Sequence, residues 1–423
     1  MMHHSKKWVA AAAIAAAAVL AMTGCAGGGA SDSKTEVTVW HYWDGTNADT
    51  FDSIVKSYNE NHSNVTIKSV NVPNADFLTK VQASARSKTL PTMVIGDLIW
   101  VPQIAQIGTL ADLSKSIPSD TLSDINPALT SYGSQGGKQV SVPVSANNLG
   151  FLYNTDLFKQ AGLDPTKPPT TWDELIADGK TILQKTGKPG YELFTHAGDN
   201  GEGLTWDFQV NLWQAGGQFL NDDNTKAAFN TSAGKKALQY WADLIKDGVS
   251  PFAPWGAFEK GAAASAQEGS WMVGIWANDP PFPFASAPIP YPSDGKPATN
   301  LGGEQAMVFD GDAAATKAAG DFLAWFLQPK QVTSWSEATG MLPVTNTVAT
   351  SDDYLSWVDG HQPLLRPYVE QMADARARPN TPLYSKASFA FAQEIEKVLA
   401  GQTTVSDGLD NAEAAVNKIL SGS

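Results

Sequence analysis

The chain has 423 residues and a formal net charge of −14, and its length predicts two or three domains. Nucleic acid and anionic lipid headgroups would repel so acidic a chain, so neither is an expected partner. Cys25 is the only cysteine, which excludes an internal disulfide, a CxxC redox pair and a cysteine zinc site.

Residues 1–24 have the pattern of a signal peptide. Two lysines precede an apolar run that ends at Leu20 and is shorter than the ~20 residues that a membrane-spanning helix needs. Cys25 follows in a stretch that resembles a bacterial lipobox, in which the cysteine carries the lipid and begins the mature protein. An ordinary signal peptide with a chance cysteine is the alternative. Residues 25–34 are rich in Gly and Ser and are expected to form a flexible tether.

The hydrophobic periodicity that follows predicts an α/β protein. A strand, a helix and a strand within residues 36–70 form a βαβ unit, which predicts a parallel sheet. Further strands are expected at residues 91–95, 140–143, 149–153, 271–275 and 306–309. Helices are expected at residues 172–185, 205–215, 232–247, 314–327, 364–375, 387–400 and 405–420.

Polar and aromatic residues follow the first and third predicted strands. Trp43 and Asp44 come directly after the first, and Asp97 comes directly after the third. Ligands of open parallel sheets bind beyond the carboxyl ends of the strands. An indole face covers the C–H groups of a sugar while a carboxylate accepts its hydroxyl hydrogens, so these residues are candidate sugar ligands. The alternative is that Trp43 belongs to the core and Asp44 caps the next helix.

Trp206 and the pair Asn147 and Asn148 are considered next on chemical grounds. Trp206 begins a helical stretch and is a candidate to stack on a sugar ring, whereas Trp213 is expected in the core. Asn147 and Asn148 interrupt an apolar segment, and a buried amide needs hydrogen-bond partners. Either a hydroxyl-rich ligand or hinge backbone would supply those partners.

Five segments, in this order, resemble motifs of the bacterial extracellular solute-binding proteins of ABC importers, a family with maltose-, oligosaccharide- and glycerol-3-phosphate-binding members. The segments are residues 142–165, 168–175, 269–276, 302–304 and 339–344. The resemblance implies a two-lobed fold of the periplasmic-binding-protein type, with discontinuous lobes joined by hinge strands. The implied division is residues 35–145 with 310–360 for lobe 1, residues 146–300 with 361–423 for lobe 2, and residues 301–309 for the hinge region.

The resemblance also implies further ligand-binding positions, namely Asn147, Trp276, Asn278, Gly303, Glu304 and Met341. Trp271 and Trp276 are five residues apart around a predicted strand and are expected to face opposite sides. The family's pattern favours Trp276 as the one that faces the cleft.

The function implied is capture of a mono- or oligosaccharide in an interlobe cleft and its delivery to an ABC permease. The protein is expected to be an extracytoplasmic monomer, attached to the cell membrane only by its lipid, with no cofactor, no metal and no catalytic residue. Glycerol-3-phosphate is the alternative ligand, with Arg376 or Arg378 near the phosphate. Asp44, Asp97 and Glu304 would repel such an anion, which favours a neutral or cationic sugar.

Other classes of protein stay open as alternatives. A secreted glycoside hydrolase needs two carboxyl groups across a sugar, and Asp44, Asp97 and Glu304 are the candidates. A metal-binding lipoprotein would need scattered histidines to meet in space. An adhesin is the third alternative, although the sequence contains no repeat to support it.

Overall fold

The computed structural model describes residues 34–198 and 200–422. The predicted signal peptide, Cys25 and all but the last residue of the predicted tether lie outside these residues. In the described part of the chain, no helix is both long and apolar enough to cross a membrane.

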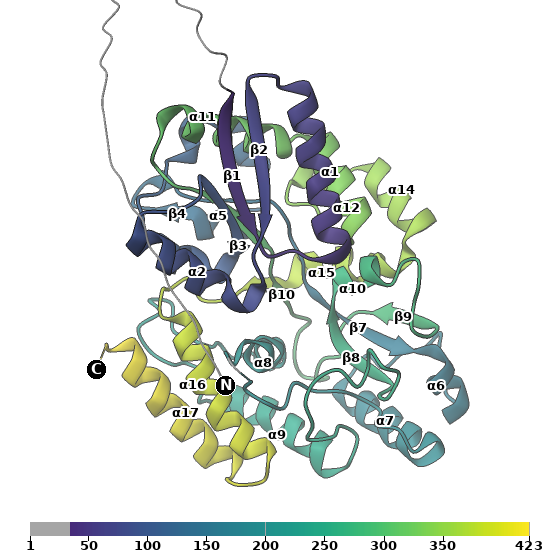
Figure 1. Cartoon of the computed structure of the whole chain (residues 1–423). Helices are drawn as coiled ribbons and strands as arrows, with labels where there is room; N and C mark the ends of the chain where they lie inside the picture. Colours follow the sequence, from purple (N-terminus) through teal and green to yellow (C-terminus); the bar gives the residue numbers. More distant parts are fainter. Residues whose placement is uncertain (1–33, 199, 423) are drawn as a thin grey trace, which may run out of the picture. The chain divides into compact units, whose positions relative to one another are not determined.

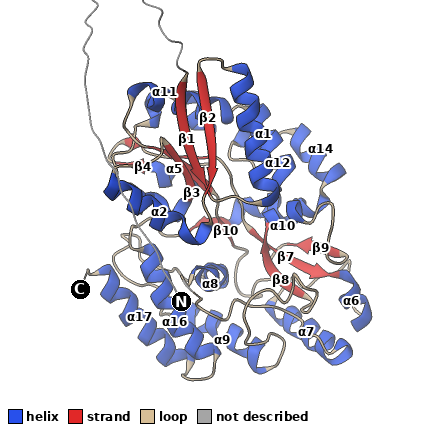
Figure 2. Ribbon diagram, in the orientation of Figure 1, coloured by secondary structure: helices blue, strands red, loops and turns tan. Residues whose placement is uncertain are grey.

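A five-stranded mixed sheet organises the first part of the fold, in the order β2-β1-β3-β11-β6. Figures 1 and 2 show β1, β2 and β3 of this sheet side by side. β1 is parallel to β2 and β3, which confirms the predicted βαβ unit, whereas β11 is antiparallel to both β3 and β6. The strands are β1 (Thr35–His41), β2 (Val65–Asn71), β3 (Met93–Asp97), β6 (Val142–Pro143) and β11 (Glu304–Val308).

Helices cover both faces of this sheet. The side chains of β1 alternate between the two faces, and apolar residues point to each of them. Val37 and Val39 contribute to the core beneath α1, where Phe51 and Tyr58 are buried at helical spacing. Trp40 lies on the other face, with the cluster that contains Phe77 of α2. The helices around this sheet are α1 (Gly45–Asn61), α2 (Asn74–Ser87), α11 (Ala313–Phe326) and α12 (Pro329–Thr339).

A three-stranded antiparallel sheet organises the second part, in the order β8-β7-β9. Its strands are β7 (Leu149–Asn154), β8 (Ser265–Gly269) and β9 (Phe284–Ala287). The helices of this part are α6 (Thr155–Ala161), α7 (Trp172–Thr186), α8 (Glu202–Gln214), α9 (Ser232–Lys246), α16 (Tyr384–Leu399) and α17 (Val405–Leu420). α8 is buried along most of its length because α9 and α16 pack against it (Figure 1).

The chain passes between the two sheets in segments that are hydrogen-bonded to one another. Asn147 N donates to Gly302 O at 3.1 Å, and Gly302 N donates back to Asn147 O at 2.9 Å. Leu342 N donates to Ala146 O at 2.7 Å, which adds a third crossing segment. Gly303 has φ +133°, which favours glycine, and a Cβ there would collide with the backbone of the neighbouring crossing. β11 makes up most of the predicted hinge region, residues 301–309, and it lies within the five-stranded sheet rather than between the two sheets. The predicted lobe boundaries stay a prediction.

Several short elements complete the described fold. They are β4 (Ser134–Gln135), β5 (Lys138–Gln139), β10 (Thr299–Leu301), β12 (Ala375–Ala377), α3 (Val101–Ile104), α4 (Ser119–Asp124), α5 (Pro127–Gly133), α10 (Ser270–Ile275), α13 (Asn346–Ala349), α14 (Asp352–His361) and α15 (Arg366–Gln371). The predicted strand at residues 271–275 is wrong, because these residues form α10 and the strand lies just before it, as β8. The single helix predicted at residues 364–375 is instead α15, flanked by 3-10 turns.

Candidate ligand-binding cavity

A cavity of about 320 Å³ lies where the crossing segments meet the carboxyl ends of β1 and β3. This volume is within the usual range for small-molecule sites. Its walls come from β3 and β11 of the five-stranded sheet, from α1, α2, α8 and α10, and from the crossing segments. The lining residues are Tyr42, Trp43, Asp44, Asn47, Asn74, Asp97, Asn147, Trp206, Trp271, Ile275, Gly303, Glu304, Met341 and Arg378.

Most of the positions that the sequence singled out come together in this one cavity. Eight of them line it, although they are spread over some 300 residues of chain: Trp43, Asp44, Asp97, Asn147, Trp206, Gly303, Glu304 and Met341. The strand-end positions converge because β1 and β3 are parallel neighbours, so their carboxyl ends share one edge of the sheet. Glu304 joins them because it pairs with Asp97 in the register of β11 and β3.

Trp276 and Asn278 are not among the lining residues. Trp276 is buried among aromatic rings, with ring centroids 5.2 Å from Phe284 and 5.8 Å from Phe282. Asn278 is exposed in the turn after α10. The physical reason is that this segment is helical: Trp271 and Ile275, four residues apart, share one helix face and line the cavity, while Trp276 points to the core.

Two tryptophans form the aromatic wall of the cavity. The rings of Trp206 and Trp271 stack with their centroids 5.7 Å apart and an interplanar angle of 14°. The guanidinium of Arg378 lies 5.0 Å from the centroid of the Trp206 ring, within cation–π range. Trp271 thereby takes the place that the sequence gave to Trp276.

Glu304 is the most enclosed carboxyl group of the cavity, with 4% of the residue exposed. Burial raises its pKa to about 7; the hydrogen bond from Tyr42 acts in the opposite direction, and the nearby Asp97 carboxylate adds to the rise. Tyr42 OH donates to Glu304 Oε1 at 2.8 Å, and Ser145 Oγ donates to Glu304 Oε2. Near neutral pH this group therefore exists in both forms, and only the protonated form is a hydrogen-bond donor.

Arg378 is the single cationic side chain among the described lining residues. Its side chain is only 1% exposed, and it forms ion pairs with Asp97 at 2.9 Å and with Glu202 at 2.6 Å. Burial opposes its charge, but these two carboxylates outweigh burial and raise the pKa of Arg378 above its usual value. The sequence showed Arg378 only as a possible phosphate contact, because neither carboxylate is near it along the chain.

Five cavity residues carry polar atoms without a partner in the described part of the chain. These atoms are the amide oxygens of Asn47 and Asn147, the indole nitrogens of Trp43 and Trp206, and the Nε of Arg378. A buried polar group left unpaired costs about 1–3 kcal/mol, so a ligand that pairs with these atoms gains that energy. Hydroxyl groups suit the set, because each hydroxyl both donates and accepts. Within residues 34–198 and 200–422, no group of three or more His, Cys, Asp and Glu side chains is placed to hold a metal ion.

The fold and this cavity define a solute-binding protein. The chain belongs to the family described as bacterial extracellular solute-binding protein, whose model matches residues 53–360. Its two-lobed α/β fold is the fold of that family, as the predicted fold class requires. Membership places it among proteins that bind solutes outside the cytoplasm.

Three named proteins are similar to this chain over most of its length. The crystal structure of the cyclic α-maltosyl-1,6-maltose binding protein from Arthrobacter globiformis is 68% identical, covers 92% of this chain and 100% of that chain, and has a TM-score of 0.87. An ABC transporter solute-binding protein from Thermotoga lettingae, bound with α-D-tagatose, is 26% identical over 92% of this chain and 100% of that chain, with a TM-score of 0.79. The sn-glycerol-3-phosphate-binding periplasmic protein UgpB of Yersinia pestis is 27% identical over 338 residues, 74% of each chain.

Proposed function

We propose that this protein binds an α-linked oligosaccharide in the cavity and delivers it to the permease of an ABC importer. The observation that carries the proposal is the stacked pair Trp206 and Trp271 in one cavity with unpaired amide oxygens and the Glu304 carboxyl group. Aromatic faces cover the C–H groups of a pyranose ring, and the polar groups pair with its hydroxyls. Family membership supports the delivery step, and it also supports a binding rather than a catalytic role.

The ligand class is a neutral glucan of about four sugar units, close to cyclic α-maltosyl-1,6-maltose. The relative that is 68% identical supports this class, because its structure is described as a protein that binds this cyclic sugar. At such identity over the whole of that chain, the walls of the cavity are expected to be largely shared. The cavity also has an aromatic wall, Trp206 and Trp271, on which glucose rings can stack.

The charge balance supports a sugar over glycerol-3-phosphate. A phosphate needs an unpaired cation, but Arg378 already holds both Asp97 and Glu202. Asp44 and Glu304 line the same cavity and would repel an anion. Arg376, the other candidate from the sequence, is exposed and does not line the cavity.

The site of action follows from the N-terminal sequence. Residues 1–24 act as a signal peptide, Cys25 carries the lipid, and the remaining tether links a monomeric binding unit to the outer face of the cell membrane. Labelling with a radioactive fatty acid is expected to mark the wild-type protein and to leave Cys25→Ser unmarked. Equal labelling of both proteins would contradict the anchor.

The experiment that tests the function is calorimetric titration with cyclic α-maltosyl-1,6-maltose, maltotetraose and glycerol-3-phosphate. A sugar is expected to bind with a Kd near or below micromolar, about −8 kcal/mol, and the phosphate ester is expected not to bind. Chromatography of the sugar after incubation is expected to return it unchanged. Binding of the phosphate ester alone, or hydrolysis of the sugar, would contradict the proposal.

A further inference from the structure

Aromatic residues of two separate segments meet at the surface beside the sugar cavity. The ring of Phe194 stacks on that of Trp255, with centroids 3.9 Å apart and an interplanar angle of 4°. The centroid of the His196 ring lies 4.4 Å from that of Phe252. Phe252 is 38% exposed, and the other three residues are partly exposed. These four residues are called the aromatic surface below.

Buried hydrogen bonds hold the aromatic surface in place. Glu192 is only 3% exposed, and its carboxylate accepts hydrogen bonds of 2.7–2.8 Å from the backbone N–H groups of residues 256–258. Thr195 Oγ1 donates to Ala253 O at 2.8 Å. Hydrogen bonds that a carboxylate accepts from backbone N–H groups are among the stronger ones in proteins. The loop that carries two of the rings is therefore fixed against the segment that carries the other two.

The aromatic surface is continuous with the walls of the sugar cavity. Phe194 packs against Gly203 in the first turn of α8, where a Cβ would come within 2.7 Å of its ring. Trp206 lies three residues further on the same helix, about 4.5 Å along its axis, and lines the cavity. In the loop, the ring of Phe258 lies 5.9 Å from that of Trp276, which directly follows α10. The aromatic surface therefore begins within one helical turn of the aromatic wall.

The pattern of exposed apolar residues follows the same line. Phe252 and Ile275 are the two exposed large hydrophobic residues of the described chain, at 38% and 49%. Ile275 lines the cavity, and Phe252 belongs to the aromatic surface. Exposed apolar side chains that gather in one region mark sites at which a ligand or partner binds. A ligand that extends out of the cavity over this loop covers both.

The size of the cavity indicates which ligand does so. About 320 Å³ is near the small end of the range for sites that enclose a drug-sized ligand. A linear glucan of many units is larger than such a ligand, so the cavity encloses only part of it. The units that lie outside the cavity then pass over the neighbouring residues of α8 and of the loop.

We propose that the protein also binds linear α-glucans of more than four units, and that the units beyond the cavity lie against the aromatic surface. This inference rests on the proposed function, because the cavity has to hold the first units. The exposed parts of the Phe252 and Trp255 rings cover C–H groups of the additional units. The hydroxyls of those units stay in water, so the aromatic surface needs no polar side chain to pair with them.

Calorimetric titration with maltotetraose and maltoheptaose tests the inference. Wild type is expected to bind maltoheptaose about tenfold more tightly than maltotetraose. Phe252→Ser and Trp255→Ala are each expected to raise the Kd for maltoheptaose about fivefold, the value of one aromatic contact, and to leave the Kd for maltotetraose unchanged. Phe252 is exposed, so its replacement leaves the fold intact, and a thermal melt checks Trp255→Ala.

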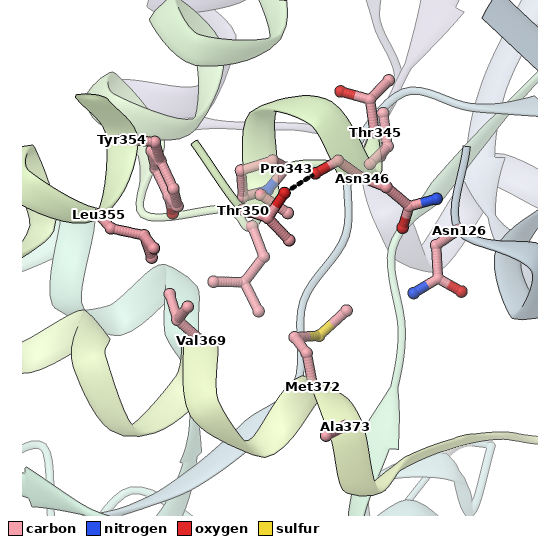
Figure 3. Close-up of a pocket in the computed structure, with 13 residues that line it drawn as sticks. Asn126, Pro343, Thr345, Asn346, Thr350, Tyr354, Leu355, Val369, Met372 and Ala373 are labelled. Carbon is pink, nitrogen blue, oxygen red and sulfur yellow. Dashed lines mark hydrogen bonds between the residues drawn. The ribbon is translucent and has the colours of Figure 1, made fainter. Parts of the chain in front are cut away.

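Trp357→Ala is the matched control, because Trp357 is also partly exposed and stacks on a ring, that of Tyr354, with centroids 6.2 Å apart. Both residues lie on α14, where Tyr354 and Leu355 line a separate cavity of about 460 Å³ (Figure 3). The control is expected to bind both sugars as wild type does.

The outcomes separate the inference from the function on which it rests. If neither sugar binds to wild type, the proposed function fails and the inference fails with it. If wild type binds the two sugars equally, or if both aromatic variants bind maltoheptaose as wild type does, the proposed function stands and the inference is overturned.

Discussion

Trp271 is the side chain on which sugar affinity should depend most, because its ring faces the cavity and stacks on Trp206. We predict that Trp271→Ala raises the Kd for the bound oligosaccharide about tenfold or more, since an aromatic contact is worth about 0.5–1.5 kcal/mol beyond the area that it buries. The ring is partly exposed, so its loss leaves the melting temperature close to that of wild type. Calorimetric titration and a thermal melt measure the two effects.

Trp276→Ala is the matched control, five residues further along the chain. Its ring packs among Phe258, Phe282 and Phe284, and truncation of a core tryptophan costs about 3–5 kcal/mol of stability. A clear drop in the melting temperature is therefore expected. If Trp276→Ala loses sugar affinity at an unchanged melting temperature, the assignment of the two tryptophans is reversed.

Glu304 should make the stability of the protein depend on pH. Its pKa is raised from 4.5 to about 7, mainly by burial, so the folded state holds this proton more tightly than the unfolded state. The free energy of unfolding therefore falls as pH rises from about 4.5 to about 7, by up to about 3 kcal/mol from this group. Glu304→Gln does not ionise, and it is expected to lose this part of the pH dependence.

Urea unfolding of wild type and Glu304→Gln at several pH values measures the difference. Asp207 and Glu268 are also buried and their pKa values are also raised, chiefly by burial, but they are present in both proteins and their contribution cancels. The variant is expected to gain stability relative to wild type as pH rises through this window. Parallel pH profiles for the two proteins would show that Glu304 is not the group responsible.

At the scale of residues, the convergence of the candidate residues was predictable wherever a general rule connects sequence to place. Trp43 follows β1 and Asp97 ends β3, and because these strands are parallel neighbours, both residues line the same cavity. Arg378 was not predictable as a doubly paired residue, because its partners Asp97 and Glu202 are far from it in the sequence. Their proximity depends on how distant elements pack, and local pattern does not encode that.

At the scale of elements, β8 and α10 show where periodicity misleads. The apolar run at residues 271–275 looks like a buried strand, but the actual strand is the preceding segment Ser265–Gly269, which includes Gln267 and Glu268. All five residues of that strand are buried in spite of their polarity. The helix places Trp271 instead of Trp276 toward the cavity, so one error in an element produced the error in a site residue. The long amphipathic helices, such as α9 and α17, were predicted within a few residues.

Arg378 joins elements that are distant in the chain, so its loss should affect stability strongly. It pairs with Asp97 at the end of β3 and with Glu202 at the start of α8. We predict that Arg378→Met destabilises the protein by about 3 kcal/mol or more, because two mostly buried carboxylates lose their partner. Chemical unfolding measures this, with Arg376→Met as a control that should stay within about 0.5 kcal/mol of wild type. Equal effects of the two substitutions would rule out a special role for the ion-pair network.

At the scale of the whole molecule, the cavity has walls from parts of the chain that adjoin different sheets. Trp43 follows β1 and Asp97 ends β3 of the five-stranded sheet, whereas Trp271 lies in α10, directly after β8 of the three-stranded sheet. A sugar that contacts both sets gains its full contact energy only when they are close together. Sugar binding is therefore expected to favour the form in which the two sheets approach each other, in proportion to its preference for that form.

This expectation is testable with spin labels on exposed positions of the two parts. Lys56→Cys on α1 and Lys246→Cys on α9 provide the pair, in a protein that carries Cys25→Ser so that no other thiol is labelled. Addition of the oligosaccharide is expected to narrow the distribution of distances between the labels and to shift it toward shorter values, and glycerol-3-phosphate is expected to leave it unchanged. At a sugar concentration of 100 times the Kd, binding should also stabilise the protein by about 2.7 kcal/mol. If the sugar stabilises the protein by this amount while the distance distribution stays the same, binding occurs without closure, and release to the permease must then depend on a signal other than the approach of the two sheets.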